Sequence, residues 1–428
     1  MTRMKESGID WIGQIPEEWE VKRIKNIASI ERGASPRPID KFISDDDTGV
    51  NWIRIGDTYK ENKYITSTKL KITNRGKQFS RYIHPGTLIL SNSMSFGEPY
   101  ISSIYGCIHD GWLSLAPNNN ISKEYLYWLL LSDVCTSQFN LVSIGAVVEN
   151  LSVDKVGNTL VSMPYSLYEQ QKIADFLDKK TAQLDKAKAL LEEQIQKLKE
   201  YRASLIHETV TKGLDKNVPM KDSGIDWIGQ VPQGWGVKPL KYLASYDDET
   251  LTQSEINSNR KIDYVDISSV EFTKGINGYQ EFLTLEAPSR ARKIAKKGDT
   301  IISTVRTYLK AIAYVNNDYI VSTGFCVVRS KKINSKYLNY TIMSDSFTGP
   351  VSKYAWGVSY PAISSGQLVN IPIPFPESIE EQLLIVDYLD HKMLQINQLI
   401  DIKQEQIDNI NKQRQTLIYD YVTGKRRV

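Results

Sequence analysis

ESGIDWIGQIPEEWEVKRIKNIAS, at residues 6–29, returns later in the chain as DSGIDWIGQVPQGWGVKPLKYLAS, at residues 222–245. The two stretches lie 216 residues apart and are identical at 15 of 24 positions, including two tryptophans and a proline. A long-period repeat of this kind indicates the architecture before any local pattern does. The chain is therefore a tandem duplication, and its two copies should fold alike.

A second pair of matching segments lies further along each copy. SLYEQ at residues 166–170 corresponds to SIEEQ at residues 378–382, and the spacing of 212 residues also aligns Gly86 with Gly298. The spacing therefore shrinks by four residues between about residues 30 and 85. Because the ends of the copies agree while their middles diverge, we expect one frame that carries a different surface in each copy.

Each of these segments begins a long helix. Ser166-x-x-Glu169 and Ser378-x-x-Glu381 are capping boxes, and the apolar residues that follow recur every seven residues, as in a coiled coil. Gly213 and Gly424 stand where these helices should end. The alternative is a long core helix in each globular domain, but two such helices in register with a duplication favour packing on each other. The predicted packing residues are Leu177, Leu184, Leu191, Leu198 and Leu205 in the first copy and Leu389, Ile396, Ile410 and Leu417 in the second, where Lys403 interrupts the series.

The predicted fold class is α+β. Segments such as NWIRIGDTY (51–59) and KIDYVDISSV (261–270) have the β-branched and aromatic composition of strands. We expect two mixed α/β domains separated by two long antiparallel coiled-coil helices, with the copies related by a pseudo-twofold axis. The predicted boundaries are 1–165 for the first domain, 166–213 for the first helix, 214–376 for the second domain and 377–428 for the second helix.

The composition bounds the function only loosely. The 428 residues carry a formal net charge of +3, so any surface for a polyanion must be local. The three cysteines, Cys107, Cys135 and Cys326, lie far apart, which argues against a disulfide framework and against a zinc site. No stretch has the length and apolarity of a signal peptide or of a membrane span, so we expect a cytoplasmic protein.

Two basic runs occupy equivalent positions in the copies. Both end just before the aligned glycines, Gly86 and Gly298. A single run is usually only a solvated face, but paired runs in otherwise divergent regions predict contacts with the phosphates of double-stranded DNA. The first run contains Lys60, Lys63, Lys69, Lys71, Arg75, Lys77 and Arg81, with Glu61 as its one acid, and the second contains Arg290, Arg292, Lys293, Lys296 and Lys297.

The aligned segments GTLILS (86–91) and GDTIIST (298–304) are predicted strands, and the residues after them are candidates for reading bases. Arginine pairs well with guanine and asparagine with adenine, so polar side chains beside a basic surface can carry sequence preference. Ordinary loop polarity is the alternative for any one of them. Because the two loops differ, we expect a bipartite and asymmetric target. The candidates are Asn92, Ser93 and Ser95 in the first copy and Thr304, Arg306, Tyr308 and Lys310 in the second.

Motifs of catalysis are missing from the sequence. There is no G-x-x-x-x-G-K-[ST] phosphate loop, no H-E-x-x-H, no Asn/Asp-Pro-Pro-aromatic tetrapeptide of amino-methyltransferases, and no cluster of carboxylates for a nuclease's magnesium. We therefore expect a protein that performs no chemistry alone and holds neither a metal ion nor a cofactor.

The chain resembles the specificity subunits of type I restriction–modification enzymes. The resemblance covers residues 6–428 and rests on both SGIDWIG openings, the strands at Gly86 and Gly298, the Pro-x-Pro segment at 372–376, and Glu-Gln before IADFLD or IVDYLD. It implies that each globular domain is a target recognition domain for one half of a split DNA site. It also implies that the helices act as a ruler and as a platform for partner subunits.

The same resemblance assigns the chemistry to partners. Two copies of a modification subunit would bind S-adenosylmethionine and methylate adenine at N6 after flipping the base, and a motor–nuclease restriction subunit would use ATP and magnesium. Two rival hypotheses remain open from the sequence. One is a coiled-coil scaffold whose end domains bind proteins, and the other is a single-chain methyltransferase or nuclease with a duplicated recognition region.

Overall fold

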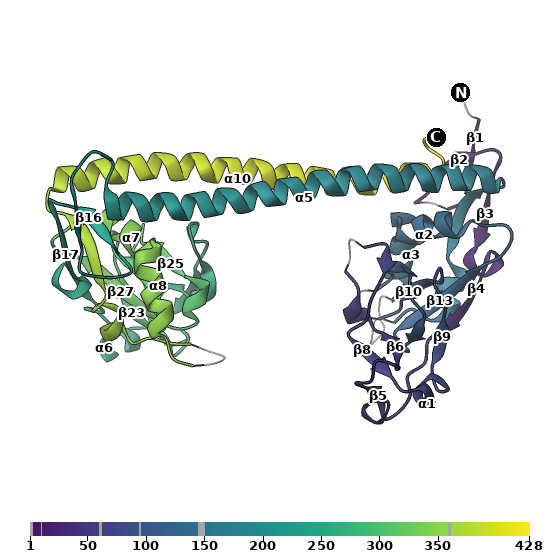
Figure 1. Cartoon of the computed structure of the whole chain (residues 1–428), viewed down its shortest axis with the longest axis horizontal. Coiled ribbons are helices and arrows are strands. Elements are labelled where there is room, and N and C mark those ends of the chain that lie inside the picture. The colour runs from purple at the N-terminus through teal and green to yellow at the C-terminus, as the bar shows by residue number, and fades with distance from the viewer. Residues whose placement is uncertain (1–2, 10, 60–61, 94–95, 144–149, 358–360) are drawn as a thin grey trace. The chain divides into compact units, whose positions relative to one another are not determined.

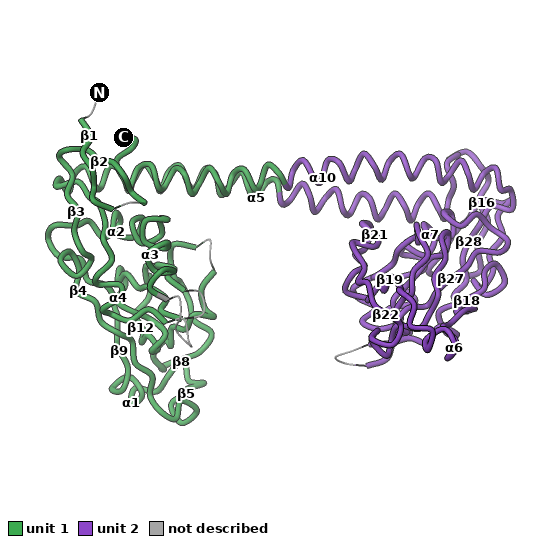
Figure 2. The backbone as a smooth tube through the Cα atoms, turned by 180° about the vertical axis from the view of Figure 1, so that it is seen from behind, with its two compact units in different colours: residues 1–191, 405–428 green, residues 192–404 purple. Residues whose placement is uncertain are grey.

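The structure is a computed structural model that describes the chain except for residues 1–2, 10, 60–61, 94–95, 144–149 and 358–360. Its contacts divide the chain into two compact units (Figure 2). Unit 1 comprises Met1–Leu191 and Glu405–Val428, and unit 2 comprises Glu192–Gln404. Each unit is therefore built from one globular domain, the first part of the long helix that follows it in the sequence, and the last part of the other long helix.

The two predicted long helices are present as α5 (Leu167–Lys212) and α10 (Ile379–Val422). Their first turns are capped as the sequence predicts, since the hydroxyls of Ser166 and Ser378 accept hydrogen bonds from the N–H groups of Glu169 and Glu381. Both helices end before a glycine in the left-handed conformation, with φ of +75° at Gly213 and +72° at Gly424.

The helices run antiparallel in each unit. In unit 1 the rings of Phe176 and Tyr421 pack in a tilted arrangement with centroids 4.4 Å apart, and Asp185 pairs with Arg414. In unit 2 the contacts are Gln194 with Lys403 and Arg202 with Asn397, so residue numbers rise along one helix as they fall along the other. The lysine that interrupts the predicted apolar series is thus accommodated, because its Nζ donates to Gln194 across the pair.

The predicted packing residues lie along this pair with graded burial. Leu177, Leu389 and Ile396 are buried, and they lie where the globular domains also cover the helices. The other predicted positions are half-buried, as expected where only two helices share an apolar seam. The half-buried positions are Leu184, Leu191, Leu198, Leu205, Ile410 and Leu417.

The globular domain of unit 1, part of which is labelled in Figure 1, contains two five-stranded sheets. Their strand orders are β4-β13-β10-β11-β7 and β5-β8-β6-β12-β9. Its strands are β1 (Met4–Glu6), β2 (Gln14–Pro16), β3 (Trp19–Arg23), β4 (Ala28–Arg32), β5 (Ile43–Ser44), β6 (Val50–Ile53), β7 (Tyr64–Ile65), β8 (Leu70–Ile72), β9 (Arg81–Ile83), β10 (Leu88–Ser91), β11 (Pro99–Ser102), β12 (Gly106–Ile108), β13 (Trp112–Pro117) and β14 (Leu160–Pro164). Its helices are α1 (Asn74–Lys77), α2 (Lys123–Leu131), α3 (Asp133–Ser143) and α4 (Val153–Asn158).

The globular domain of unit 2 contains two four-stranded sheets with orders β18-β27-β24-β25 and β22-β19-β26-β23. Its strands are β15 (Met220–Asp222), β16 (Gln230–Pro232), β17 (Trp235–Pro239), β18 (Ala244–Tyr246), β19 (Lys261–Val265), β20 (Val270–Glu271), β21 (Gly275–Ile276), β22 (Gln280–Leu283), β23 (Ala291–Ala295), β24 (Thr300–Ser303), β25 (Ile312–Tyr314), β26 (Tyr319–Ser322), β27 (Phe325–Ser330) and β28 (Pro372–Pro376). Its helices are α6 (Gln253–Asn257), α7 (Ser335–Met343), α8 (Asp345–Tyr354) and α9 (Ser365–Leu368).

The two domains share one strand order. β4-β13-β10-β11 corresponds to β18-β27-β24-β25, and β8-β6-β12-β9 corresponds to β22-β19-β26-β23. The domains differ in additions to this frame, which are β5 and β7 at sheet edges in unit 1 and the β20–β21 hairpin in unit 2. The sequence predicted that the two copies differ between their matching ends, and the structure shows that they differ in edge strands and loops.

Each unit is layered in the same way. One core lies between the two sheets, and a second core joins the first sheet to two short helices and to the long-helix segments. The short helices are α2 and α3 in unit 1 and α7 and α8 in unit 2. A buried tyrosine on the first short helix of each pair reaches the end of a long helix.

These tyrosines make the same contacts in both units. The hydroxyl of Tyr125 lies 3.3 Å from the carbonyl of Val422 and 3.4 Å from that of Ser162, and all three residues are buried. The hydroxyl of Tyr337 lies 3.2 Å from the carbonyls of both Val210 and Pro374. The last carbonyls of a helix have no partner inside the helix, so each tyrosine supplies a donor where water is excluded.

The conserved sequence segments form the rest of this junction. Trp19 and Trp235 donate from their indole N–H to Glu169 and Glu381, so the motif at the start of each copy is fixed to the first turn of the following helix. The glutamine after each glutamate is buried and donates to Pro164 or Pro376, while its oxygen accepts the N–H of Ser122 or Asn334. The two sequence segments that both copies share therefore contact each other in each unit.

Within the described residues, no helix is long and apolar enough to cross a membrane.

Replacing Tyr125 by phenylalanine should lower the free energy of unfolding by about 0.5–1.5 kcal/mol, because the buried carbonyl at the end of α10 loses one of its two donors and keeps the hydroxyl of Ser162. Tyr337→Phe should cost a similar amount, since its contacts are equivalent. Urea denaturation of each variant measures this, with Tyr168→Phe as the control because that ring is 75% exposed. Equal midpoints for Tyr125→Phe and Tyr168→Phe would show that the hydroxyl contributes nothing.

Candidate nucleic-acid interface

The basic run of unit 1 spans β8, α1 and β9 at the second sheet. The hydroxyl of Thr73 caps the short helix α1 by accepting the N–H of Gly76, and this turn leaves Arg75 exposed. Lys69 is also exposed, whereas Lys71 reaches Asp47 at 3.0 Å. Lys69 and Arg75 are therefore exposed to solvent, whereas Asp47 partly balances the charge of Lys71.

Other members of this run are committed to contacts within the domain. The ammonium of Lys77 lies 3.6 Å from the centre of the Tyr82 ring, and Arg81 binds Glu31 and the carbonyl of Arg32. Lys63 is bound by both carboxylate oxygens of Asp178 on α5 and is surrounded by aromatic rings, so it fastens the domain to the helix. Lys60 lies outside the described residues.

The basic run of unit 2 lies on β23 and the turn that follows it, at the equivalent place in the frame. Arg290 is exposed, and Arg292 donates to the carbonyl of Ser289 at 3.1 Å. Lys293 is held by Asp247 at 2.7 Å and by the carbonyl of Phe325 at 2.6 Å. Arg290 is therefore better placed than Lys293 to meet a ligand from solvent.

A carboxylate network that sequence reasoning missed neutralises the end of this run. Arg329 on β27 donates to both oxygens of Asp299 and to Glu249, which also binds Lys296. Hydrogen bonds from Lys296 and Arg329 lower the pKa of Glu249. The signal was hard to find because these residues lie on three segments that are far apart in the sequence and meet only through the sheets.

The loop after β10 in unit 1 is fixed by Asn92. This residue is buried, and its side chain donates to the carbonyl of Asp110 at 3.0 Å while its N–H donates to Gly111. Ser93 beside it is half-buried, and Ser95 lies outside the described residues. The structure thus places Asn92 behind the loop surface, as a support for the turn at 109–111.

That turn is a second feature that sequence reasoning missed. Asp110 accepts a hydrogen bond from the Ser35 hydroxyl at 2.6 Å and pairs with Arg37 at 3.1 Å. The Ser35 hydrogen bond lowers the pKa of Asp110, and burial lowers the pKa of His109. The Asp110-Gly111 dipeptide is a common turn signal that could have drawn attention to it.

The loop after β24 in unit 2 has an unusual backbone. Arg306 and Lys310 flank the 3₁₀ turn η6 (Thr307–Leu309), and both are left-handed with φ of 50° and 47°. Non-glycine residues in this region are strained, and such strain concentrates at functional sites. The strain is maintained by the hydrogen bond from the N–H of Arg306 to Pro361 and by the Lys310–Asp345 ion pair at 3.0 Å.

Some side chains of this loop are buried and support its backbone, whereas others are exposed. Thr304 is buried and its hydroxyl donates to the carbonyl of Gly324 at 2.9 Å. Arg306 and Tyr308 are exposed, with Tyr308 at 60%. Arg290 and Arg306 line one cavity, so the structure brings together members of the basic run and of the loop in unit 2.

Among the described residues no group of three or more His, Cys, Asp or Glu side chains could hold a metal ion. The three cysteines are buried, and burial raises the pKa of each thiol. The geometry thus offers polar and cationic surfaces for recognition rather than an arrangement of reactive groups.

Comparison with known proteins identifies this arrangement. A family model described as "Type I restriction modification DNA specificity domain" matches residues 16–200 and again residues 232–412. The chain belongs to this family of type I specificity subunits. The two matches reproduce the duplication, and each contains one recognition domain with most of the long helix that follows it.

Named relatives agree along the whole length. The chain is 24% identical over 425 residues to the type I restriction enzyme MjaVIII specificity subunit of Methanocaldococcus jannaschii, covering 97% of this chain and 94% of the relative. It is 25% identical to the MjaIX specificity subunit of the same organism, covering 100% and 97%. The EcoDI specificity subunit of Escherichia coli is 24% identical over 304 residues, which cover 68% of this chain and 66% of the relative.

Solved structures confirm the fold. A chain from a study of complex assembly and conformational transition of the type I R-M system superimposes with a TM-score of 0.74 at 18% identity, covering 96% of this chain and 99% of that chain. The HsdS subunit from Thermoanaerobacter tengcongensis gives 0.51 at 18% identity, with coverages of 96% and 98%. The predicted family and the predicted α+β fold with two long helices are both confirmed.

A type I specificity subunit confers DNA sequence specificity on its enzyme and is the non-catalytic component. The rival hypothesis of a single-chain methyltransferase or nuclease is therefore wrong. The residues that contact DNA are a separate question, which the similarity to relatives leaves unanswered.

Proposed function

We propose that this specificity subunit reads a bipartite, asymmetric sequence in double-stranded DNA, one part with each unit. The observation that carries the proposal is the combination of one shared strand order with unlike additions and unlike loops at equivalent positions. A shared frame presents each loop in the same way, and unlike side chains on the loops select different bases. The paired helices α5 and α10 would set the number of unread bases between the two parts.

We assign different roles to the candidate residues according to their burial. In unit 2, Arg306 and Tyr308 would read bases, while Thr304 and Lys310 hold the loop and Lys293 supports the sheet. Arg290 and Arg292 would contact phosphates. In unit 1, Lys69 and Arg75 are exposed and would contact phosphates directly. Lys71, Lys77 and Arg81 have partners within the domain and would contact phosphates by exchanging those partners. Ser93 would face the bases, and Asn92 would act through the turn that it supports.

We further propose that the helix pair positions two copies of a modification subunit, an adenine-N6 methyltransferase, together with one or more restriction subunits. S-adenosylmethionine, ATP and magnesium would then be bound by those partners. Their substrate is DNA within the cell, so the complex would act in the cytoplasm. A protein-binding scaffold without DNA recognition is the competing function, and it leaves the paired basic surfaces without a role.

Neutralising Lys69, Lys71, Arg75 and Lys77 together should weaken DNA binding and reduce its salt dependence. Each phosphate contact that is lost should lower the slope of log K against log salt by about 0.9. Titration at several salt concentrations measures this. The control neutralises four exposed lysines on α5, namely Lys172, Lys179, Lys180 and Lys186, and should leave the slope nearer to that of the wild type. An unchanged slope for the first variant would remove the basic run from the interface.

Replacing Arg306 by glycine should relax sequence preference in one part of the target only. Loss of a bidentate base contact costs about 1–3 kcal/mol of discrimination, and glycine keeps the left-handed backbone without strain. Selection from a randomised DNA pool measures the preference at each position. Asn259→Gly is the matched control, since Asn259 is an exposed residue of the same unit with φ of 50°. Equal weakening for every DNA sequence would make Arg306 a phosphate contact instead.

A further inference from the structure

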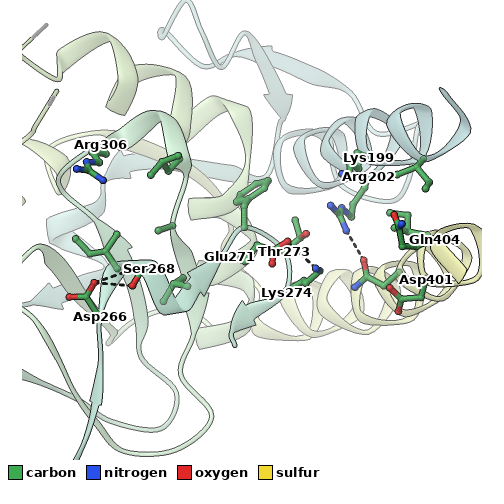
Figure 3. Close-up of a pocket in the computed structure, with 18 of the residues that line it drawn as sticks. Lys199, Arg202, Asp266, Ser268, Glu271, Thr273, Lys274, Arg306, Asp401 and Gln404 are labelled. Atoms are coloured by element: carbon green, nitrogen blue, oxygen red, sulfur yellow. Dashed lines mark hydrogen bonds and ion pairs between the residues drawn. The ribbon is translucent and has the colours of Figure 1, made fainter. Parts of the chain in front are cut away.

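A cavity of about 1350 Å³ opens in unit 2 between the paired helices and the recognition domain (Figure 3). The helices contribute Lys199 and Arg202 from α5 and Asn397 and Asp401 from α10. The other wall consists of the 3₁₀ turn η5 (Ile267–Ser269), the β20–β21 hairpin and the loop that carries Arg306. The cavity therefore joins the helix pair to the candidate DNA surface of the same unit.

The charges that line the cavity favour an anion. Glu271 is paired with Lys274 at 3.1 Å, and Asp266 accepts hydrogen bonds from Tyr264 and Ser268. Cations outnumber carboxylates in the lining even before these pairs are set aside. The cations are Lys199, Arg202, Lys274, Arg290 and Arg306, and the carboxylates are Asp266, Glu271 and Asp401.

Arg202 is the unusual member of this set. Its residue is only 9% exposed, and its Nη1 donates to the amide oxygen of Asn397 at 2.6 Å. Burial lowers the pKa of its guanidinium. Within the part of the chain that the structure describes, Arg202 forms no ion pair with a carboxylate. A neutral amide satisfies one N–H group but does not balance the charge, and Glu271 on the facing hairpin favours the charged guanidinium without forming an ion pair with it, so part of the buried positive charge is left for a ligand.

The equivalent arginine in unit 1 has a different partner. The spacing of 212 residues that aligns the copies relates Arg202 to Arg414 and Asn397 to Asp185. There the arginine and the aspartate form an ion pair at 3.3 Å between Nε and Oδ1. The same chain thus uses a carboxylate in unit 1 and an amide in unit 2, and the amide is found beside the cationic cavity. If the contact between Arg202 and Asn397 only held the helices together, an asparagine would have no advantage over an aspartate, because the aspartate would neutralise the arginine.

We propose that the cavity in unit 2 binds a backbone phosphate of the DNA, with Arg202 and Lys199 as its contacts on the helix pair. The inference rests on the proposed function and adds a contact site on the helices to it. A guanidinium binds phosphate oxygens through paired N–H groups, and Arg290 and Arg306 extend the positive wall toward the candidate reading loop. A contact of this kind fixes the register of the DNA without reading its sequence.

The test is Asn397→Asp, which gives unit 2 the ion pair that unit 1 already contains. The variant should fold, since Arg414 and Asp185 show that the helix pair accepts this arrangement. In the complex with modification subunits, wild type should lose about 3.5-fold more DNA affinity than the variant between 50 and 200 mM salt, as expected for one extra phosphate contact. Lys199→Gln should change the slope in the same direction, because Lys199 is exposed and also lines the cavity.

The matched control is Asn409→Asp, which makes the same chemical change at an exposed position of α10 that does not line the cavity. It should keep the wild-type slope, and base preference should be unchanged in every variant. If Asn397→Asp keeps the wild-type slope while sequence-specific binding persists, the cavity does not bind phosphate and the proposed function stands. If that variant instead weakens binding of the modification subunit alone, the occupant is an acidic protein segment and the inference is wrong. Absence of sequence-specific binding by the wild-type complex would overturn both proposals.

Discussion

Each unit depends on one contact, in which a buried tyrosine hydroxyl meets a carbonyl group at the end of a long helix. Tyr125 and Val422 meet across 297 residues of sequence, and Tyr337 and Val210 repeat the contact in unit 2. A helix end excluded from water needs donors for its last carbonyls, and the tyrosine and the conserved tryptophan–glutamate pair together enclose it. Unit 1 contains the last turns of α10, and unit 2 contains the last turns of α5. Neither sequence copy therefore forms a complete unit alone.

The sequence predicted the features that depend on local pattern or on repetition. The duplication, the two helices with their caps, the antiparallel pairing and the strands at Gly86 and Gly298 could all be predicted, because each leaves a period or a motif. The four-residue change in spacing has its counterpart in the edge strands, where unit 1 adds β5 and β7 and unit 2 adds the β20–β21 hairpin. Sheet order was not predictable, since pairings such as β6 with β12 join distant segments.

The sequence could predict which regions of the surface are candidates for binding, but not the roles of the individual residues in them. Basic runs identify a region, but the roles of their members depend on partners brought by folding. Lys63 and Lys293 are held by Asp178 and Asp247, which lie far from them in sequence. Asn92 has the side chain of a base reader but is buried as a support. Asn397 in unit 2 occupies the position of Asp185 in unit 1, and the two side chains differ by a single non-hydrogen atom. The sequence alone could not show that this difference matters, because the cavity beside Asn397 forms only in the folded unit 2.

The measurement that tests this account most directly is a map of methylated adenines across the genome, in cells that contain this gene and in cells that lack it. The account predicts one motif with two unlike specified parts and a fixed unread gap, and its methylation should disappear when the gene is deleted. A single continuous or palindromic motif, or methylation that persists after deletion, would contradict the claim that two unlike units on one frame each read their own part of the DNA.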